Sequence, residues 1–262
     1  MIVKKITKNS NFYNVLTEDD KKIKLHENII IKYKIFKRKI EIKEELLEKI
    51  ILENEFYLAF ENAIKYVNAI HSKRQVYLHL LKKYPKDISI KVVNKLEEMN
   101  LINDLEYARF YMQKSYKNLL GYERVKTHLI SENIDIKIIH NILEEYDFNL
   151  EEEACSKVFN KYLPNLKKNS SALAKNKMVK YLQEKGFSSN IIRKTLEKDG
   201  NLLDNINKDD ELLNINFEKL FVRYKTKYKK EELKQKLIRS LAIKGFSIKA
   251  IIDLIESREE ND

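Results

Sequence analysis

Hydrophobic residues recur along most of this chain at the three- and four-residue spacing of amphipathic helices. The clearest run covers residues 177–196, KMVKYLQEKGFSSNIIRKTL. Met178, Tyr181 and Leu182 fall on one face of a helix. Gly186 can end that helix, because glycine readily takes the left-handed conformation of a C-cap. The pattern therefore predicts a helix that stops just before residue 187.

A second helix follows this stop at once. Phe187 precedes Ser188, a residue type that caps helix starts, and Ile192 lies five positions after Phe187, the spacing of a hydrophobic staple. The residues expected to face inward from the second helix are Ile191, Ile192, Thr195 and Leu196. One short sequence thus predicts two helices and the turn between them.

The same pattern occurs three more times, with Tyr84, Ile134 and Phe246 in the place of Phe187. Gly245 is the stop in the last copy. Asn133 is the stop in the second copy, and Asn is the best non-glycine residue for a left-handed position. Asp135 and Ser247 are expected to cap the helices that follow. In the first copy Lys83 stands where glycine is expected and Pro85 follows, so that turn should differ.

The four equivalent positions are separated by 50, 53 and 59 residues, a period typical of tandem supersecondary units. A further amphipathic segment precedes each pair of helices, at residues 60–70, 107–117, 154–163 and 217–228. Each unit therefore has about three helices. We expect a mainly α protein in which four three-helix repeats form an elongated array rather than one round core.

The N-terminus is different, because residues 2–7, 12–16 and 22–25 are short β-strand candidates. We expect the following domains: a small β-containing cap at 1–40; a first repeat with an acidic lead helix at 41–105; a second repeat at 106–148; a third repeat at 149–198; an acidic flexible linker at 199–216; a fourth repeat at 217–257; and a tail at 258–262.

Charge is unevenly distributed along a chain whose formal net charge is +11. Residues 1–40 hold 11 Lys and Arg against 4 acids, and residues 154–198 hold 11 against 2. Residues 41–62 hold 2 against 7, and residues 199–218 hold 1 against 6. Clustered positive charge favours a surface that faces a polyanion. An AT-rich genome, which encodes Lys, Ile and Asn freely, is the alternative explanation for the lysine content.

The candidate residues for contact with nucleic-acid phosphates are the cations near the repeat turns. They are Lys73, Arg74, Lys82, Lys83, Arg124, Lys126, Lys177, Lys180, Lys185, Arg193 and Lys194. Arg124 and Lys126 stand at a helix start, where positive charge opposes the helix dipole unless an anion compensates. The second helices carry mixed charge, which favours phosphate contact over reading of base sequence.

Several chemistries are excluded by residue counts. The four glycines, at 121, 186, 200 and 245, cannot build a glycine-rich phosphate loop, a dinucleotide fingerprint or a nucleophile elbow. Cys155 is the only cysteine, so an internal disulfide and a thiolate metal cluster are excluded.

The histidines, at 26, 71, 79, 128 and 140, lack a third metal ligand at convincing spacing. We expect no metal, no cofactor and no catalytic site. The N-terminus lacks the apolar core of a signal peptide, and no run is long enough to span a membrane, so we expect a cytoplasmic protein.

These segments resemble the RecX family of bacterial regulators of the recombinase RecA. The similar stretches are LINDLEYARFY at 101–111, EKGFSSNIIRKTLE at 184–197, IKGFSIKAIIDLIE at 243–256 and the β-containing extension at 1–40. Differences from the family pattern are Tyr84 and Pro85 at the first turn, Tyr122 and Glu123 before Arg124, and a longer insertion at 198–216.

The resemblance implies a protein that lies along the groove of a RecA filament on single-stranded or double-stranded DNA. It also implies that the protein limits strand exchange and ATPase activity in recombination and repair. We expect a monomer that inhibits RecA. Two alternatives remain from the residues alone. One is a general nucleic-acid-binding protein, which would bind DNA without RecA and with strong salt dependence. The other is a helical scaffold for protein partners, whose binding would survive charge reversal at Lys177, Lys180 and Lys185.

Overall fold

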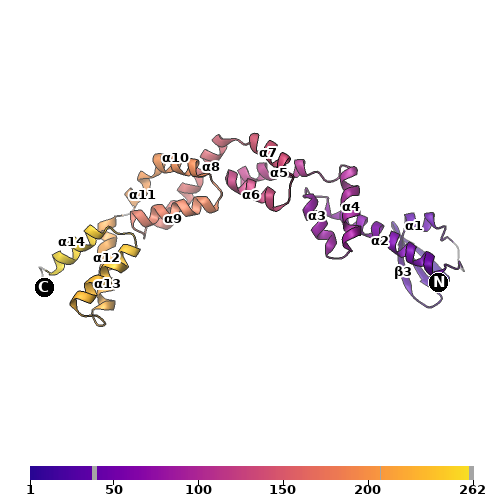
Figure 1. Ribbon diagram of the computed structural model, residues 1–262, viewed down its shortest axis with the longest axis horizontal. Helices are drawn as coiled ribbons and strands as arrows, with labels where there is room; N and C mark the ends of the chain where they lie inside the picture. Colours follow the sequence, from indigo (N-terminus) through magenta and orange to yellow (C-terminus); the bar gives the residue numbers. More distant parts are fainter. Residues whose placement is uncertain (37–39, 207, 260–262) are drawn as a thin grey trace. The chain divides into compact units, whose positions relative to one another are not determined.

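A computed structural model describes residues 1–36, 40–206 and 208–259 of the chain (Figure 1). These residues form fourteen α-helices and one small three-stranded sheet, which confirms a mainly α fold with a β-containing N-terminal part. Two compact units are present. The first comprises Met1–Phe110 and Ser131–Ile138, and the second comprises Tyr111–Ile130 and Ile139–Asp262.

The first unit begins with an antiparallel sheet of strand order β1-β2-β3. The elements are β1 (Val3–Asn9), β2 (Phe12–Thr17), β3 (Lys22–His26) and α1 (Glu27–Lys32). One face of the sheet packs on α1 around buried apolar side chains that include Val15, Leu25 and Ile29. Alternate residues of each strand point to opposite faces, so the other face of the sheet carries the polar residues.

Helix α2 (Glu44–Tyr66) joins the sheet to the first repeat. The buried side chain of Asn54 accepts a hydrogen bond from the backbone N–H of His26 at 2.7 Å and donates one to the carbonyl of Lys24 at 2.8 Å. A buried amide that satisfies both its donor and its acceptor groups fixes α2 along β3. Helices α3 (Lys73–Leu81) and α4 (Lys86–Glu98) complete the repeat around Val76, Leu80 and other buried residues.

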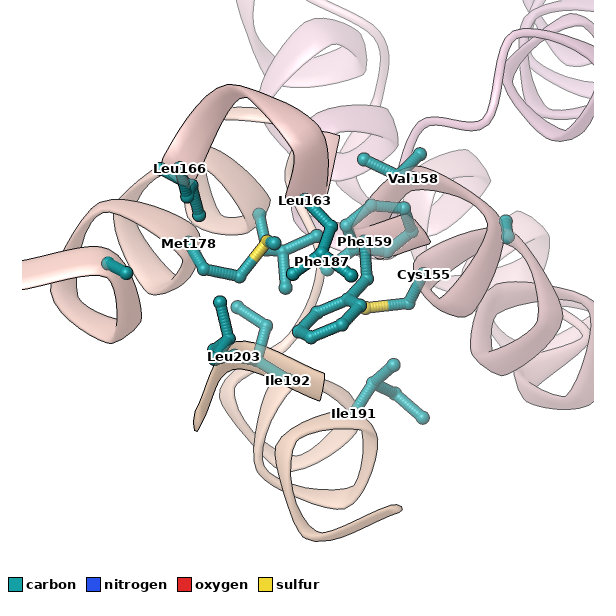
Figure 2. Close-up of a cluster of buried hydrophobic side chains, with 13 residues drawn as sticks. Cys155, Val158, Phe159, Leu163, Leu166, Met178, Phe187, Ile191, Ile192 and Leu203 are labelled. Atoms are coloured by element: carbon teal, nitrogen blue, oxygen red, sulfur yellow. The ribbon is translucent and has the colours of Figure 1, made fainter. Parts of the chain in front are cut away.

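The remaining helices follow the three-helix pattern. They are α5 (Asp104–Lys117), α6 (Tyr122–Ser131), α7 (Ile136–Glu144), α8 (Phe148–Tyr162), α9 (Ser171–Glu184), α10 (Ser189–Asp199), α11 (Asn201–Ile206), α12 (Asp209–Tyr224), α13 (Lys230–Ile243) and α14 (Ile248–Glu259), with a 3-10 turn η1 at Leu163–Leu166. In the third repeat, Phe159 of α8, Met178 of α9 and Ile192 of α10 point toward one another (Figure 2). Each such side chain adds about 2 kcal/mol on burial.

The repeat turns have the expected backbone. Gly186, Gly245 and Asn133 have φ values of 84°, 86° and 55°. The side chain of Asp135 accepts a hydrogen bond from the N–H of Lys137, and that of Ser247 accepts one from Ala250. The hydroxyl of Ser188 makes no capping hydrogen bond. Its backbone N–H donates instead to the carboxylate of Glu151, so this helix start is held from another helix.

The expected flexible linker at 199–216 is instead largely helical. Helix α11 begins at Asn201, and the first helix of the fourth repeat begins at Asp209 rather than at residue 217. Leu203 and Leu213 are buried, so apolar packing holds this segment. The acidic residues that suggested a linker, Asp209 among them, lie in the first turn of α12, where negative charge is favourable to the helix dipole.

Candidate nucleic-acid interface

Helix α9 carries the most coherent group of the expected cations. Ala174, Met178 and Leu182 are buried on its inner side. Lys177 and Lys180, three positions apart, are exposed beside this buried stripe, and Lys185, the C-cap residue of α9, is partly exposed near Tyr181. We call these three residues the α9 lysine face. A helix packed on one side and exposed on the other is a rigid support for such a row.

The charges of the α9 lysine face are not neutralised by acids. Lys177 Nζ donates to the amide oxygen of Asn169 at 2.6 Å, a neutral partner. Lys185 Nζ lies 5.5 Å from the ring centre of Tyr181, which stacks on Tyr162 at 3.8 Å. No ion pair involves these lysines within the part of the chain that the structure describes. Tyr162 and Tyr181 are half-buried against the core of the third repeat, so the lysines without acidic partners, rather than the rings, suit a nucleic-acid strand through its phosphates.

Arg124 lies at the turn that follows α9. It lines a pocket of about 420 Å³ together with Thr127, Gln183, Glu184 and Gly186. The structure therefore brings Arg124 of α6 to the end of α9, although the two are about sixty residues apart in sequence. Lys126 is exposed on the same helix, α6.

The anion expected at the start of α6 is supplied by the protein itself. Glu151 of α8 is fully buried, and its Oε1 accepts hydrogen bonds from the backbone N–H groups of Tyr122 and Ser188, both at 3.1 Å. Burial raises the pKa of the Glu151 carboxyl, and these hydrogen bonds oppose the rise. The position of Arg124 and Lys126 at a helix start is thus no indication of an external anion.

The two cations of α10 differ from the α9 lysine face, because both have acidic partners. Arg193 contacts Glu197 at 3.0 Å, and Lys194 lies 3.6 Å from Glu152 of α8. Arg193 also lines a groove of about 610 Å³ between α9 and α10, with Lys175 on the opposite wall. The residues that line this groove do not include Lys177, Lys180 or Lys185. The sequence alone could not separate these two groups.

In the first unit the four expected cations also divide into two pairs. Lys73 forms an ion pair with Glu97, and Arg74 lines a pocket of about 510 Å³ that includes Asp104 and Glu132. Lys82 and Lys83 are exposed just beyond the end of α3. Their charge is favourable at a helix C-terminus and is available to a partner.

A second cationic surface was missed by the sequence reasoning. Lys5 and Lys22 flank Leu16 in one cross-strand row, and Lys24 lies in the next row, with its Nζ 4.0 Å from the ring centre of Phe12. We call Lys5, Lys22 and Lys24 the sheet lysine face. The alternation Lys22-Ile23-Lys24-Leu25 is the signal that could have revealed it, because it places both lysines on the face away from the core.

The sheet lysine face differs from the other lysines of the N-terminal part. Three of those are paired with acids within 3 Å: Lys4 with Asp20, Lys8 with Glu27 and Lys32 with Glu53. The described residues contain no ion pair of Lys5, Lys22 or Lys24. Unpaired lysines therefore gather on one face of this sheet.

The described histidines and the cysteine are found in packing and stacking contacts. Groups of three possible metal ligands are absent from the described ranges. His71 and His79 stack on opposite sides of Tyr66, and His79 contacts the side chain of Asn62 at 2.8 Å. Cys155 is buried, and burial raises the pKa of its thiol to about 11, which leaves it protonated and unreactive at neutral pH.

Membrane insertion finds no support in the described helices, since none is both long and apolar enough to cross a bilayer.

Comparison with known proteins agrees with the repeat architecture. A family model described as "RecX, third three-helix domain" matches residues 150–196. Regulatory protein RecX of Listeria monocytogenes serotype 4b (strain CLIP80459) is 26% identical over 255 residues, which cover 96% of this chain and 94% of the relative. Regulatory protein RecX of Streptococcus mutans serotype c is 27% identical over 258 residues, covering 96% and 97%. A crystal structure of regulatory protein RecX, 19% identical, has a TM-score of 0.60 and covers 75% of this chain and 98% of its own.

Proposed function

Because this chain belongs to the RecX family, we propose that it is a non-enzymatic regulator that binds the filament formed by the recombinase RecA on DNA. The observation that carries the proposal is similarity to proteins named regulatory protein RecX over nearly the whole of both chains. The relatives therefore share the N-terminal part and the repeats, not one module.

The α9 lysine face is the surface that we propose contacts DNA phosphates in the filament. Its cations have no acidic partner within the described residues, so phosphates would not compete with an internal ion pair. Arg193 and Lys194 would have to break contacts with Glu197 and Glu152 first. We therefore propose Lys177, Lys180 and Lys185 as the principal contacts, Arg124, Lys82 and Lys83 as secondary ones, and the sheet lysine face as an additional one.

The proposed effect on RecA is inhibition of ATPase activity and strand exchange. A filament repeats the same sites along its length, and a protein with repeated units can make several weak contacts at once. Linked contacts raise the overall affinity by orders of magnitude without any single strong site. A regulator held in this way would restrict the filament without any chemical step of its own.

The test is RecA ATPase on single-stranded DNA, with and without this protein at two salt concentrations, beside DNA binding in the absence of RecA. We expect inhibition at protein amounts well below those that saturate the DNA. The double variant Lys177→Glu, Lys180→Glu should weaken inhibition at least tenfold, because two phosphate contacts become repulsive. Lys249→Glu, a reversal at an exposed lysine of α14, is the matched control and should act as wild type.

Other outcomes would change the assignment. Inhibition that appears only when the DNA is coated would favour a general nucleic-acid-binding protein. Unchanged ATPase at stoichiometric amounts would refute the proposal. Full inhibition by the double variant would exclude the α9 lysine face and favour contacts with protein alone.

A further inference from the structure

The second helix of a repeat begins, at three places in the chain, against residues of the following repeat. In the second unit this occurs at the start of α6. Gly121 N–H donates to the carbonyl of Lys185 at 3.0 Å, and Glu123 N–H donates to that of Gly186 at 2.9 Å. Tyr122 N–H donates to Glu151 at 3.1 Å. Three consecutive backbone N–H groups at the start of α6, from Gly121 to Glu123, are thus satisfied by the third repeat.

The start of α9 has the same arrangement toward the fourth repeat. Ser170 is buried, and its hydroxyl donates to the carbonyl of Lys244 at 2.7 Å. Ser171 N–H donates to the carboxylate of Asp209 at 2.9 Å, and the Ser171 hydroxyl lies 3.1 Å from the same oxygen.

The first unit contains a third example at the start of α3. The hydroxyl of Ser72, also buried, donates to Glu132 at 2.6 Å. Lys73 N–H donates to the carboxylate of Asp104 at 2.9 Å. The positions are equivalent, because Ser72, Gly121 and Ser170 are 49 residues apart in each step.

One rule describes the three places. The donor is the N–H of the first residue of a second helix: Lys73, Tyr122 or Ser171. The acceptor is a carboxylate in the first turn of the next repeat's lead helix: Asp104, Glu151 or Asp209. The first N–H groups of a helix have no partner within it, and negative charge is favourable at a helix start. One carboxylate therefore serves the starts of two helices in neighbouring repeats.

We infer that this contact is a recurring joint between repeats, and that Asp104, Glu151 and Asp209 are positioning residues which hold neighbouring repeats in a fixed orientation. Glu151 makes the strongest case, since it is fully buried and also accepts the N–H of Ser188. Burying a carboxylate is costly unless it is hydrogen-bonded. An apolar side chain could fill the same space without this desolvation cost, so packing alone does not account for a carboxylate at this position.

The joints bear on filament binding, a consequence that rests on the proposed function. Linked contacts reinforce one another only where the geometry lets them engage together. If the joints keep cationic surfaces of successive repeats at a fixed spacing, loosening one joint should weaken binding to a repeating partner while each repeat stays folded.

The experiment measures amide hydrogen exchange by NMR and binding of the protein to RecA filaments on single-stranded DNA. In Glu151→Ala, the amides of Tyr122 and Ser188 should exchange at least about tenfold faster, because their acceptor is lost. Filament affinity should fall at least about tenfold. Glu151→Gln keeps an acceptor oxygen and should retain protection within about threefold. Glu153→Gln, at an exposed glutamate of the same helix, is the matched control.

Two results would overturn the inference. Exchange of Tyr122 and Ser188 in Glu151→Ala within twofold of wild type would show that the carboxylate does not hold the joint. Faster exchange with unchanged filament affinity would show that the joint does not position the binding surfaces. If Glu151→Ala fails to fold, Asp209→Ala with the Ser171 amide as readout gives the same test at the next joint. Failure of wild type to bind filaments would refute the proposed function and leave the exchange result standing.

Discussion

The turn between α3 and α4 and the turn between α9 and α10 join equivalent helices in the first and third repeats, but their surroundings differ. At Gly186 the backbone has φ of 84°, and an added Cβ would lie 2.4 Å from Cβ of Arg124 and 2.5 Å from its N. At the first turn Lys83 is exposed, and Tyr84 donates its hydroxyl to the carbonyl of Leu58 at 3.1 Å. The α9–α10 turn packs against the preceding repeat, whereas the α3–α4 turn is held by a hydrogen bond within its own repeat.

The difference explains why the first turn needs no glycine. Among the described residues, the elements before the first repeat are the three-stranded sheet and α1, and Lys83 is not one of the residues with a positive φ. Gly186 serves two purposes, a left-handed conformation and close contact with α6. Gly245 repeats this, because an added Cβ would lie 2.5 Å from Oγ of Ser170. Glycine at these turns is therefore required by the assembly of neighbouring repeats as well as by the turn itself.

The largest expected effect comes from filling the joint at Gly186. Gly186→Ala should lower the free energy of unfolding by about 3 kcal/mol, from about 1–2 kcal/mol of left-handed strain and about 1–3 kcal/mol of overpacking against α6. Urea unfolding followed by circular dichroism measures this. The matched control is Lys83→Gly at the first turn, where the change should stay below about 1 kcal/mol. Equal losses for the two variants would contradict the comparison.

The sequence was informative wherever a local rule applied. Asn133, Gly186 and Gly245 could be identified as turn residues because left-handed backbone limits the residue type at one position. Spacing rules also located the helices. The cap of α10 was only half correct: Ser188 stands at the N-cap, but its N–H is held by Glu151, a contact that depends on packing between helices far apart in sequence.

The candidate site was less accessible to sequence reasoning. The sequence gives the position of a cation but not its ion-pair partner. Lys177 and Arg193 are therefore equivalent candidates in the sequence, and only the structure shows that Arg193 is paired with Glu197. The sheet lysine face depends on strand register, which the alternation at Lys22 and Lys24 hinted at but did not fix. The acidic composition of residues 199–216 predicts a linker, whereas the buried Leu203 and Leu213 pack the helices α11 and α12 that this segment contains.

A smaller effect should come from the contact that fixes the first turn. Tyr84→Phe removes the hydroxyl that donates to the carbonyl of Leu58 and should cost about 1 kcal/mol. Urea unfolding again measures it. Tyr77→Phe, at a tyrosine of α3 that lines the 510 Å³ pocket, is a control expected to cost less. Hydrogen exchange at the joint amides Tyr122 and Ser188 should not change in Tyr84→Phe, and faster exchange there would mean that the first turn also serves the joint.

The smallest expected effect is on the pH dependence of amide protection, which should have opposite signs in helix α3 and at the amides of Tyr122 and Ser188. Burial, then Lys82, Lys83 and His71, lower the pKa of His79 below its ordinary 6.5. The folded state thus favours the neutral ring, and this contribution to stability is full above pH 6.5 and is lost as the pH falls through the lowered pKa.

Burial raises the pKa of Glu151 above its ordinary 4.5, with a further rise from Glu123, against the opposing hydrogen bonds from Ser188 and Tyr122. Its contribution is full below pH 4.5 and is lost as the pH rises through the raised pKa. Between pH 6.5 and 4.5, acidification should therefore weaken protection of the α3 amides and leave or strengthen that of Tyr122 and Ser188, after correction for intrinsic exchange. His79→Gln should abolish the first trend and Glu151→Gln the second. Parallel trends that survive both substitutions would show that neither group governs its region, and the contrast between the two regions would then rest on packing alone.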